Sequence, residues 1–206
     1  MIHTSLSFLT NQLNQYLKLK TGTPDVDRVF LTSIATETGG IMIPDKSLGV
    51  SLINIEEERV YKDQRTAYMN KEGNVEYYNP EINLNLYVLI SANFQDNDEI
   101  DTSDDYVEGL KQLSFIISFF QAKNVFTREN SPSLISYDPN ISKLVVELYS
   151  YSFEQLYNFW SVVGAKYLPS VLYKIRLITF QEREFQQSSA PIEQVSVNGK
   201  SKGYDY

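Results

Sequence analysis

An acidic run is the first place in this sequence to look for metal chemistry. It reads "QDNDEIDTSDDY" and carries Asp96, Asp98 and Asp101 at short intervals. A calcium loop that begins at Asp96 needs an oxygen ligand at its fifth position and a glycine at its sixth, but Ile100 and Asp101 occupy these positions. The run fits better as a solvated loop whose carboxylates favour the N-terminus of a following helix.

Three other patterns carry weak chemical signals. His3 is the single histidine and lies two residues from the start, a poor position for a Ser-His-Asp arrangement. The run "EEER", Glu56–Arg59, offers paired carboxylates, but charges at a strand end more often blunt a sheet edge. "TGG", Thr38–Gly40, lacks the lysine and the spacing of a phosphate-binding loop. We predict that the protein is not an enzyme and has no catalytic residue, cofactor or metal.

Composition excludes several classes of partner. The 206 residues include 18 Lys and Arg against 26 Asp and Glu, for a formal net charge of −8. Because no basic stripe is present to neutralise phosphates, we expect no nucleic-acid partner. The longest apolar stretch, within Leu110–Phe120, is too short and too interrupted to insert in a membrane. The first residues resemble no secretory signal, so we expect a cytoplasmic protein unless it leaves by another route.

Polar residues on predicted strands are better candidates for an interface. The segment "INLNLYVLISANF" alternates apolar residues with Asn83 and Asn85, and then becomes apolar on both faces. We expect its asparagine-lined half to meet water or a neighbouring subunit. Lys174 and Arg176 share one face of the last predicted strand, where they face solvent or contact an acidic neighbouring subunit.

The polar C-terminal segment is a further candidate. Its stretch "PIEQVSVNG" places Val195 and Val197 at the spacing of a strand. An extended segment of this kind can add itself to the edge of a neighbouring sheet, with disorder as the alternative in the isolated protein. We therefore divide the chain into a single domain, residues 1–182, and a polar tail or arm, residues 183–206.

Hydrophobic periodicity predicts the elements that position these residues. Period-two or β-branched runs predict strands at Arg28–Ala35, Gly49–Tyr61, Ile82–Phe94, Lys143–Ser152 and Val171–Phe180. A turn signal at Glu72–Asn74 predicts a protruding hairpin before the third of these strands.

Apolar residues at steps of three and four predict three helices. Their stripes are Leu6, Leu9, Leu13 and Tyr16, then Tyr106, Leu110, Leu113, Ile117 and Phe120, and finally Phe153, Leu156, Trp160, Val163 and Tyr167. The second helix also carries apolar residues beside its stripe, so we expect it to be covered on more than one side. Ser152 and Gln155 fit a capping box that begins the third helix, which Pro169 should end. These elements predict an α+β fold, with a mixed, largely antiparallel sheet flanked by helices.

Four segments in order, "LSFLTNQLNQYL", "INLNLYVLISANF", "YVEGLKQLSFIISFFQ" and "GAKYLPSVLYKIRLI", resemble a known family. They are similar to the cap, or tail-terminator, proteins of phage-tail-like extracellular contractile injection systems. The type is that of the antifeeding prophage and the Photorhabdus virulence cassette. The likeness covers nearly the whole chain up to Gln181, and its segments are fold and interface patterns rather than catalytic motifs.

The resemblance implies a tail-terminator-like fold and a structural function. Such a protein forms a ring, expected to be a hexamer, on the distal end of the inner tube and sheath. There it ends polymerisation and stabilises the sheath. The implied partners are further copies of the chain, the inner tube protein and the sheath protein. The implied place is the cytoplasm during assembly and the contractile particle thereafter, including outside the cell if the particle is released.

Two other functions remain open on the residues alone. One is a structural adaptor of the same machine that docks on the sheath or baseplate, which the end of the particle carrying the protein would distinguish. The other is a hydrolase or metal enzyme that uses the acidic run. In that case, replacing Asp96, Asp98 and Asp101 together by Asn would abolish an activity or a metal-dependent melting shift, and we expect neither effect.

Overall fold

The chain divides into two units, which are described one at a time. The computed structural model describes residues 1–58, 67–69, 75–77, 83–94, 102–179 and 187–189. The larger unit combines Met1–Lys62 with Glu81–Phe180, and the smaller combines Asp63–Pro80 with Gln181–Tyr206. The smaller unit thus joins the segment of the predicted hairpin to the C-terminal segment. The division into a domain, residues 1–182, and a tail, residues 183–206, stays a prediction.

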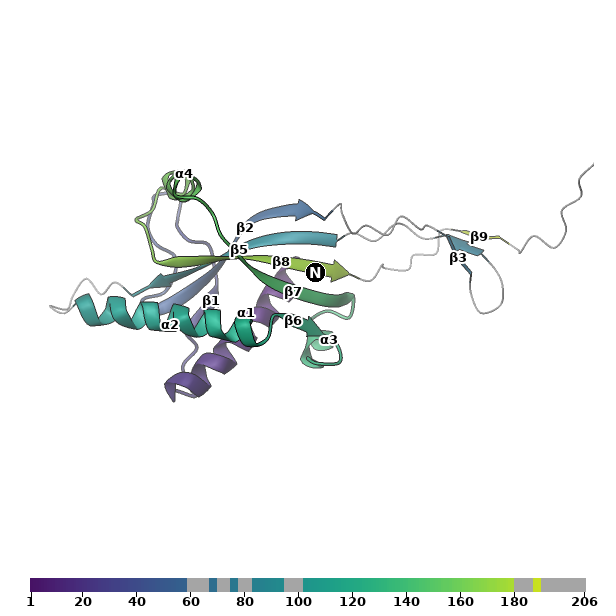
Figure 1. Cartoon of the computed structure of the whole chain (residues 1–206), viewed down its shortest axis with the longest axis horizontal. Helices are drawn as coiled ribbons and strands as arrows, with labels where there is room; N and C mark the ends of the chain where they lie inside the picture. The colour runs from purple at the N-terminus through teal and green to yellow at the C-terminus, as the bar shows by residue number, and fades with distance from the viewer. Residues whose placement is uncertain (59–66, 70–74, 78–82, 95–101, 180–186, 190–206) are drawn as a thin grey trace, which may run out of the picture. The chain divides into compact units, whose positions relative to one another are not determined.

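In the described part of the larger unit, four helices accompany a six-stranded sheet (Figure 1). The helices are α1 (Ile2–Thr21), α2 (Thr102–Ala122), α3 (Ser133–Tyr137) and α4 (Phe153–Val163). The strands, in order across the sheet, are β1 (Val29–Leu31), β2 (Ser47–Glu57), β5 (Asn83–Asn93), β8 (Ser170–Thr179), β7 (Ile141–Tyr149) and β6 (Val125–Thr127). β1 runs parallel to β2, and the other neighbouring pairs are antiparallel. The predicted α+β fold with a mixed, largely antiparallel sheet is confirmed.

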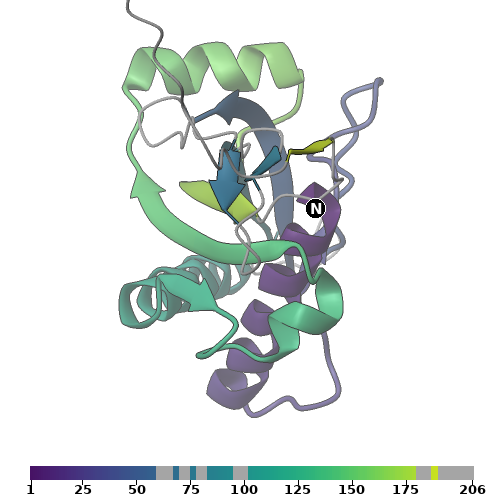
Figure 2. The same ribbon diagram turned by 90° about the vertical axis from the view of Figure 1, so that its right-hand side faces the viewer.

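Helices cover the sheet on both faces. Figure 2 shows α1 and α2 on one face and α4 on the other. The larger core lies between the sheet and the α1–α2 layer, and it includes the fully buried Phe8, Ile116 and Leu144. A smaller core lies beneath α4, around Leu89 and Trp160. Neither β6 nor α3 was predicted, because elements of three and five residues are too short to show periodicity.

The central strand β5 explains the change of pattern in "INLNLYVLISANF". Leu86, Val88 and Ile90 lie in the core shared with α1 and α2, while Leu89 lies in the core beneath α4. The second half of β5 is therefore covered from both sides by its own chain. The helix that follows β5 covers one of these faces, as predicted, and α4 covers the other.

The observed buried stripe of α2 is rotated relative to the predicted one. The positions in the core are Leu113, Ile116 and Phe120. The exposed apolar positions of this helix are Tyr106, Val107, Leu110 and Ile117. α2 packs on the core with one face, so the expectation that it is covered on more than one side is wrong for the single chain. Among the described helices, none has the length and apolarity needed to cross a membrane.

α4 begins as predicted but ends earlier. The backbone N–H of Gln155 donates to Oγ of Ser152 at 3.2 Å, and the N–H of Ser152 donates to Oε1 of Gln155 at 2.9 Å. This is the predicted capping box. The helix stops at Gly164, whose φ of 68° is left-handed. Glycine adopts this conformation without a side-chain clash, so the prediction that Pro169 ends the helix is wrong.

A buried amide joins α1 to the first strand. Asn14 donates from Nδ2 to the carbonyl oxygen of Val29 at 2.8 Å. Its Oδ1 accepts from the backbone N–H groups of Arg28 and Val29, each at 2.9 Å. Buried backbone groups need partners, so Asn14 satisfies three of them and holds the start of β1 beside the helix.

We predict that Asn14→Ala lowers the free energy of unfolding by about 2–3 kcal/mol, because it leaves buried backbone groups of β1 unpaired. Urea denaturation followed by circular dichroism measures the change. Gln15→Ala, at an exposed neighbouring position on α1, is the matched control and should stay within about 0.5 kcal/mol of the unmodified chain. An Asn14→Ala effect as small as that of the control would contradict the anchoring role.

The smaller unit contains a sheet of three short strands. They are β3 (Ala67–Met69), β4 (Val75–Tyr77) and β9 (Gln187–Ser189). β4 lies in the middle and pairs antiparallel with both neighbours. The pairing of β3 with β4 confirms the predicted hairpin, whose turn lies outside the described residues. The strand of the tail is Gln187–Ser189, while Val195 and Val197 lie outside the described residues.

Candidate interface surfaces

The α4-side face of the sheet carries a polar cluster that includes residues predicted at an interface. Opposite residues of paired strands share a face, and the register places Asn85 between Glu56 on β2 and Arg176 on β8. Nδ2 of Asn85 donates to Oε2 of Glu58 at 3.0 Å. The exposed fractions of Asn83 and Asn85 are only 7% and 4%, so the expectation that they meet water is wrong. Their contact with a neighbouring subunit stays a prediction.

Arg176 is held by two carboxylates of its own chain. Its Nε lies 3.8 Å from Oε2 of Glu58, and its Nη2 lies 3.7 Å from Oε2 of Glu147. Glu58 is buried, so Arg176 balances a charge that has been removed from water. Lys174 lies on the same face of β8, as predicted, but forms no ion pair with the described carboxylates. Of the two cations, Lys174 is the better candidate for a contact with another protein.

Tyr87 ties β5 to the same cluster. Its hydroxyl donates to Oε2 of Glu56 at 2.9 Å, and its ring meets that of Tyr149 edge-on with centroids 5.2 Å apart. Partial burial and the hydrogen bond to Glu56 raise the pKa of Tyr87 to about 12. A phenol that keeps its proton throughout the neutral range is a fixed donor here, not a general acid or base poised for catalysis.

The residues considered for metal or hydrolytic chemistry form no such site in the described ranges. Asp96–Asp101 lies outside them. Asp105, in the first turn of α2, has its Oδ2 3.7 Å from Nζ of Lys46. His3 is exposed on α1. Within the described residues, no group of three His, Cys, Asp or Glu side chains is arranged to hold a metal ion.

The glycines of Thr38–Gly40 serve a turn. Gly39 has a φ of 83°, and a Cβ at this position would lie 2.8 Å from the carbonyl oxygen of Gly164. Both the left-handed backbone and the close approach to the end of α4 require glycine. The motif thus has a structural reason that involves no phosphate.

α4 presents aromatic side chains outward. Phe153 is 91% exposed, and Tyr157 and Tyr167 are also exposed. The ring of Trp160, which is buried, meets that of Tyr167 edge-on with centroids 5.5 Å apart. These four aromatic residues line a shallow groove of about 550 Å³. Contiguous exposed apolar surface of this kind is typical of a site that contacts another protein.

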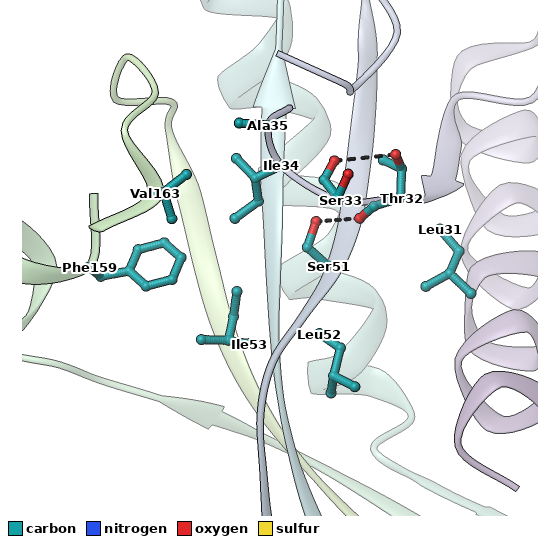
Figure 3. A pocket seen from close by; sticks show the side chains of 10 residues that line it. All are labelled: Leu31, Thr32, Ser33, Ile34, Ala35, Ser51, Leu52, Ile53, Phe159 and Val163. Atoms are coloured by element: carbon teal, nitrogen blue, oxygen red, sulfur yellow. Dashed lines mark hydrogen bonds between the residues drawn. The ribbon is translucent and has the colours of Figure 1, made fainter. Parts of the chain in front are cut away.

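An open pocket of about 580 Å³ lies where β1 leaves the side of β2. Figure 3 shows Phe159 and Val163 of α4 on one side of it and Leu31 of β1 on the other. Leu52 and Ile53 of β2 lie between them. The polar part of the lining consists of serine and threonine. No titratable side chain lines this pocket, so it suits apolar groups of a partner rather than chemistry.

Neither of these surfaces was predicted from the sequence. The stripe predicted for α4 placed Phe153 and Tyr167 on one face with Trp160, but of these three only Trp160 is buried, and Tyr167 lies beyond the end of the helix. The pocket left no signal in the sequence, because its lining comes from β1, β2 and α4, which are far apart in the sequence.

We predict that Arg176→Met lowers the free energy of unfolding at neutral pH by about 3 kcal/mol, because it removes a cation that lies beside the buried carboxylate of Glu58. Lys174→Met is the matched control on the same strand face and should stay within about 0.5 kcal/mol of the unmodified chain. Chemical denaturation measures both variants. Equal losses for the two would show that Arg176 has no special part in the polar cluster.

The chain matches one protein family and is similar in fold to known structures. The model of the Pvc16 N-terminal domain family matches residues 6–194. No curated protein matches the chain. The PVC sheath/tube terminator of an extracellular contractile injection system, in the extended state, is similar with a TM-score of 0.53 and 13% identity over 93% of this chain and 63% of its own. The anti-feeding prophage tube-terminating cap has the same TM-score and identity, over 93% of this chain and 60% of its own.

The chain thus spans less than two thirds of either of these structures. At 13% identity the likeness concerns the fold, and it confirms the predicted tail-terminator-like architecture.

Proposed function

Because the chain belongs to the family of the Pvc16 N-terminal domain, we propose that it is a structural cap of a contractile injection particle. The cap ends polymerisation of the inner tube and sheath at the distal end of the particle, and it stabilises the sheath. The observation that carries this proposal is the shared fold over 93% of the chain with two structures described as a sheath/tube terminator and a tube-terminating cap.

Surface chemistry supports a partner-binding role over catalysis. The described residues contain no metal-binding cluster, and the polar face of the sheet is built from ion pairs and hydrogen bonds within the chain. The outer faces of α2 and α4, in contrast, leave large apolar side chains uncovered in the single chain. Burial of such surfaces by another protein is favourable, because it removes apolar area from water. The protein therefore acts through its interfaces.

The partners are other copies of the chain, the inner tube protein and the sheath protein. The copies form a ring, because head-to-tail contacts whose rotation closes leave no free end. The ring is expected to be a hexamer. Lys174 contacts an acidic surface of a neighbouring subunit, with Asn83, Asn85 and Arg176 forming the base of that contact. Val195 and Val197 add a strand to a neighbouring sheet edge. The cap assembles in the cytoplasm and stays with the particle when it is released.

Particle length is the direct test. Particles made without this gene should have over-long, variable or uncapped tubes when they are measured by electron microscopy. A tagged copy expressed in trans should restore the length and label the distal end. Normal particles without the gene would overturn the cap function, and a label at the baseplate end would indicate the docking adaptor instead.

A charge reversal tests the ring contact. We predict that Lys174→Glu reduces capping of the particles, because it places a carboxylate against the acidic neighbour. Glu147 lies opposite on β7, so we also expect a loss of about 0.5 kcal/mol in folded stability, too small to unfold the chain. Lys20→Glu, at the exposed end of α1, is the control and should cap normally. Particle length by electron microscopy and melting temperature measure both effects. Normal capping by Lys174→Glu would remove Lys174 from the interface.

A further inference from the structure

α4 has the smallest share in the cores among the three long helices. All of its residues are described, and only Trp160 is buried, whereas α1 buries seven residues. The core beneath α4 has five buried residues, while the core on the other face of the sheet extends over α1, α2 and all six strands. A helix in a protein is stabilised mainly by the apolar area that it buries, so α4 is held less firmly than α1 or α2.

Two pockets lie against α4. The open pocket of about 580 Å³ is bordered on the helix side by Phe159 and Val163 (Figure 3). A second pocket, of about 180 Å³, lies between Gln155 and Phe159 of the helix and Leu89 and Leu172 of the sheet. Side chains that border a gap lose dispersion contacts on that side. The packing of α4 on the sheet is therefore incomplete along two parts of the helix.

The outer face of α4 is also apolar. Phe153, Tyr157 and Val162 are exposed in the single chain. α4 therefore has large apolar side chains both on the face toward the sheet and on the face away from it. Separation of the helix from the sheet exposes little apolar area beyond Trp160 and the small core, so its cost in free energy is low for a helix of this length.

The two ends of α4 are attached differently. At the C-terminal end, the carbonyl oxygen of Gly164 lies so near the turn between β1 and β2 that a Cβ on Gly39 would be 2.8 Å from it. Gly164 itself has a φ of 68°, and nothing lies within 4 Å of the place of its missing Cβ. At the N-terminal end, the capping box joins Ser152 to Gln155, which moves with the helix. Gly164 is therefore the natural hinge.

We propose that α4 opens locally as one unit, hinged at Gly164, while α1, α2 and the sheet stay folded. The open state uncovers Leu89 and Leu172, and it removes the aromatic groove that α4 forms with Tyr167. Parts of a fold with few buried apolar contacts open in this way, and elements that change on binding are drawn from them.

The consequence for assembly rests on the proposed function. A partner that contacts the closed form of α4 better than the open form shifts the chain toward the closed form. Closing of α4 and assembly of the cap are therefore coupled. The opening itself is a property of the free chain and is tested without particles.

Hydrogen exchange of the free full-length chain is the first test. We expect the backbone amides of α4 to exchange about tenfold faster, or more, than those of the second half of α2, because their opening does not require unfolding of the larger core. Mass spectrometry of the peptides of each helix measures both rates. Equal rates would show a single cooperative unit and would overturn the proposal.

Cysteine accessibility tests whether α4 separates from the sheet, because the chain contains no cysteine. Leu89 and Val88 are neighbours on β5 and are 2% and 1% exposed, but Leu89 lies beneath α4 and Val88 beneath α1 and α2. A maleimide should label Leu89→Cys about tenfold faster, or more, than Val88→Cys. Equal labelling would show that α4 stays closed or that the whole unit opens, and either result would overturn the proposal.

A pair of glycine variants tests the attachment. Gly39 and Gly22 both have left-handed φ values, 83° and 68°, so alanine strains the backbone at each. Only at Gly39 does the added Cβ meet the end of α4, since nothing lies within 4 Å at Gly22. Gly39→Ala should speed the labelling of Leu89→Cys about tenfold, and Gly22→Ala should leave it unchanged. Equal effects would overturn the hinge. Slow labelling of Val88→Cys in both variants shows that the larger core stays folded.

Capped particles separate this inference from the cap function. Leu89→Cys should be labelled more slowly in particles than in the free chain, because assembly favours the closed form. The same rate in both would overturn the coupling. Particles of normal length without the gene would overturn the cap function, whatever the labelling of the free chain shows about α4.

Discussion

Burial of the central strand β5 on both faces is the constraint on which the larger unit depends. Leu86, Val88 and Ile90 require cover on one face and Leu89 requires it on the other, because exposed apolar area raises the free energy of the folded chain. α1 and α2 supply the first layer and α4 supplies the second. The sheet order, with β5 and β8 in the middle, places the most apolar strands where both layers reach them.

Over the first half of β5, which α4 does not cover, polar interactions replace apolar packing. Asn85, Glu58 and Arg176 meet over the first half of β5, and Tyr87 donates to Glu56 beside them. Each partner compensates part of the cost of removing another from water. The polar side chains on this face of the sheet therefore pair with one another within one chain, although their pattern in the sequence is typical of a solvent-exposed face.

The same packing leaves apolar side chains exposed elsewhere on the larger unit. α2 and α4 each use one face for the core, and their remaining apolar side chains project outward. β1 is too short to accompany β2 over its whole length, so an edge and a pocket remain where it turns away. A chain that completes its core but leaves apolar side chains of α2 and α4 exposed is suited to contacts with other proteins, which fits the proposed cap.

Local patterns determined much of this structure from the sequence alone. The capping box of Ser152 and Gln155, the hairpin, the alternating strands and the mixed, largely antiparallel sheet depend on short-range spacing, and the structure has them. Only the tertiary structure decided which helix face meets the core, that Asn83 and Asn85 are buried, and that Asn14 holds β1. These outcomes depend on partners from distant parts of the chain. Periodicity identifies an amphipathic segment, but it contains no information about which distant residues will cover it.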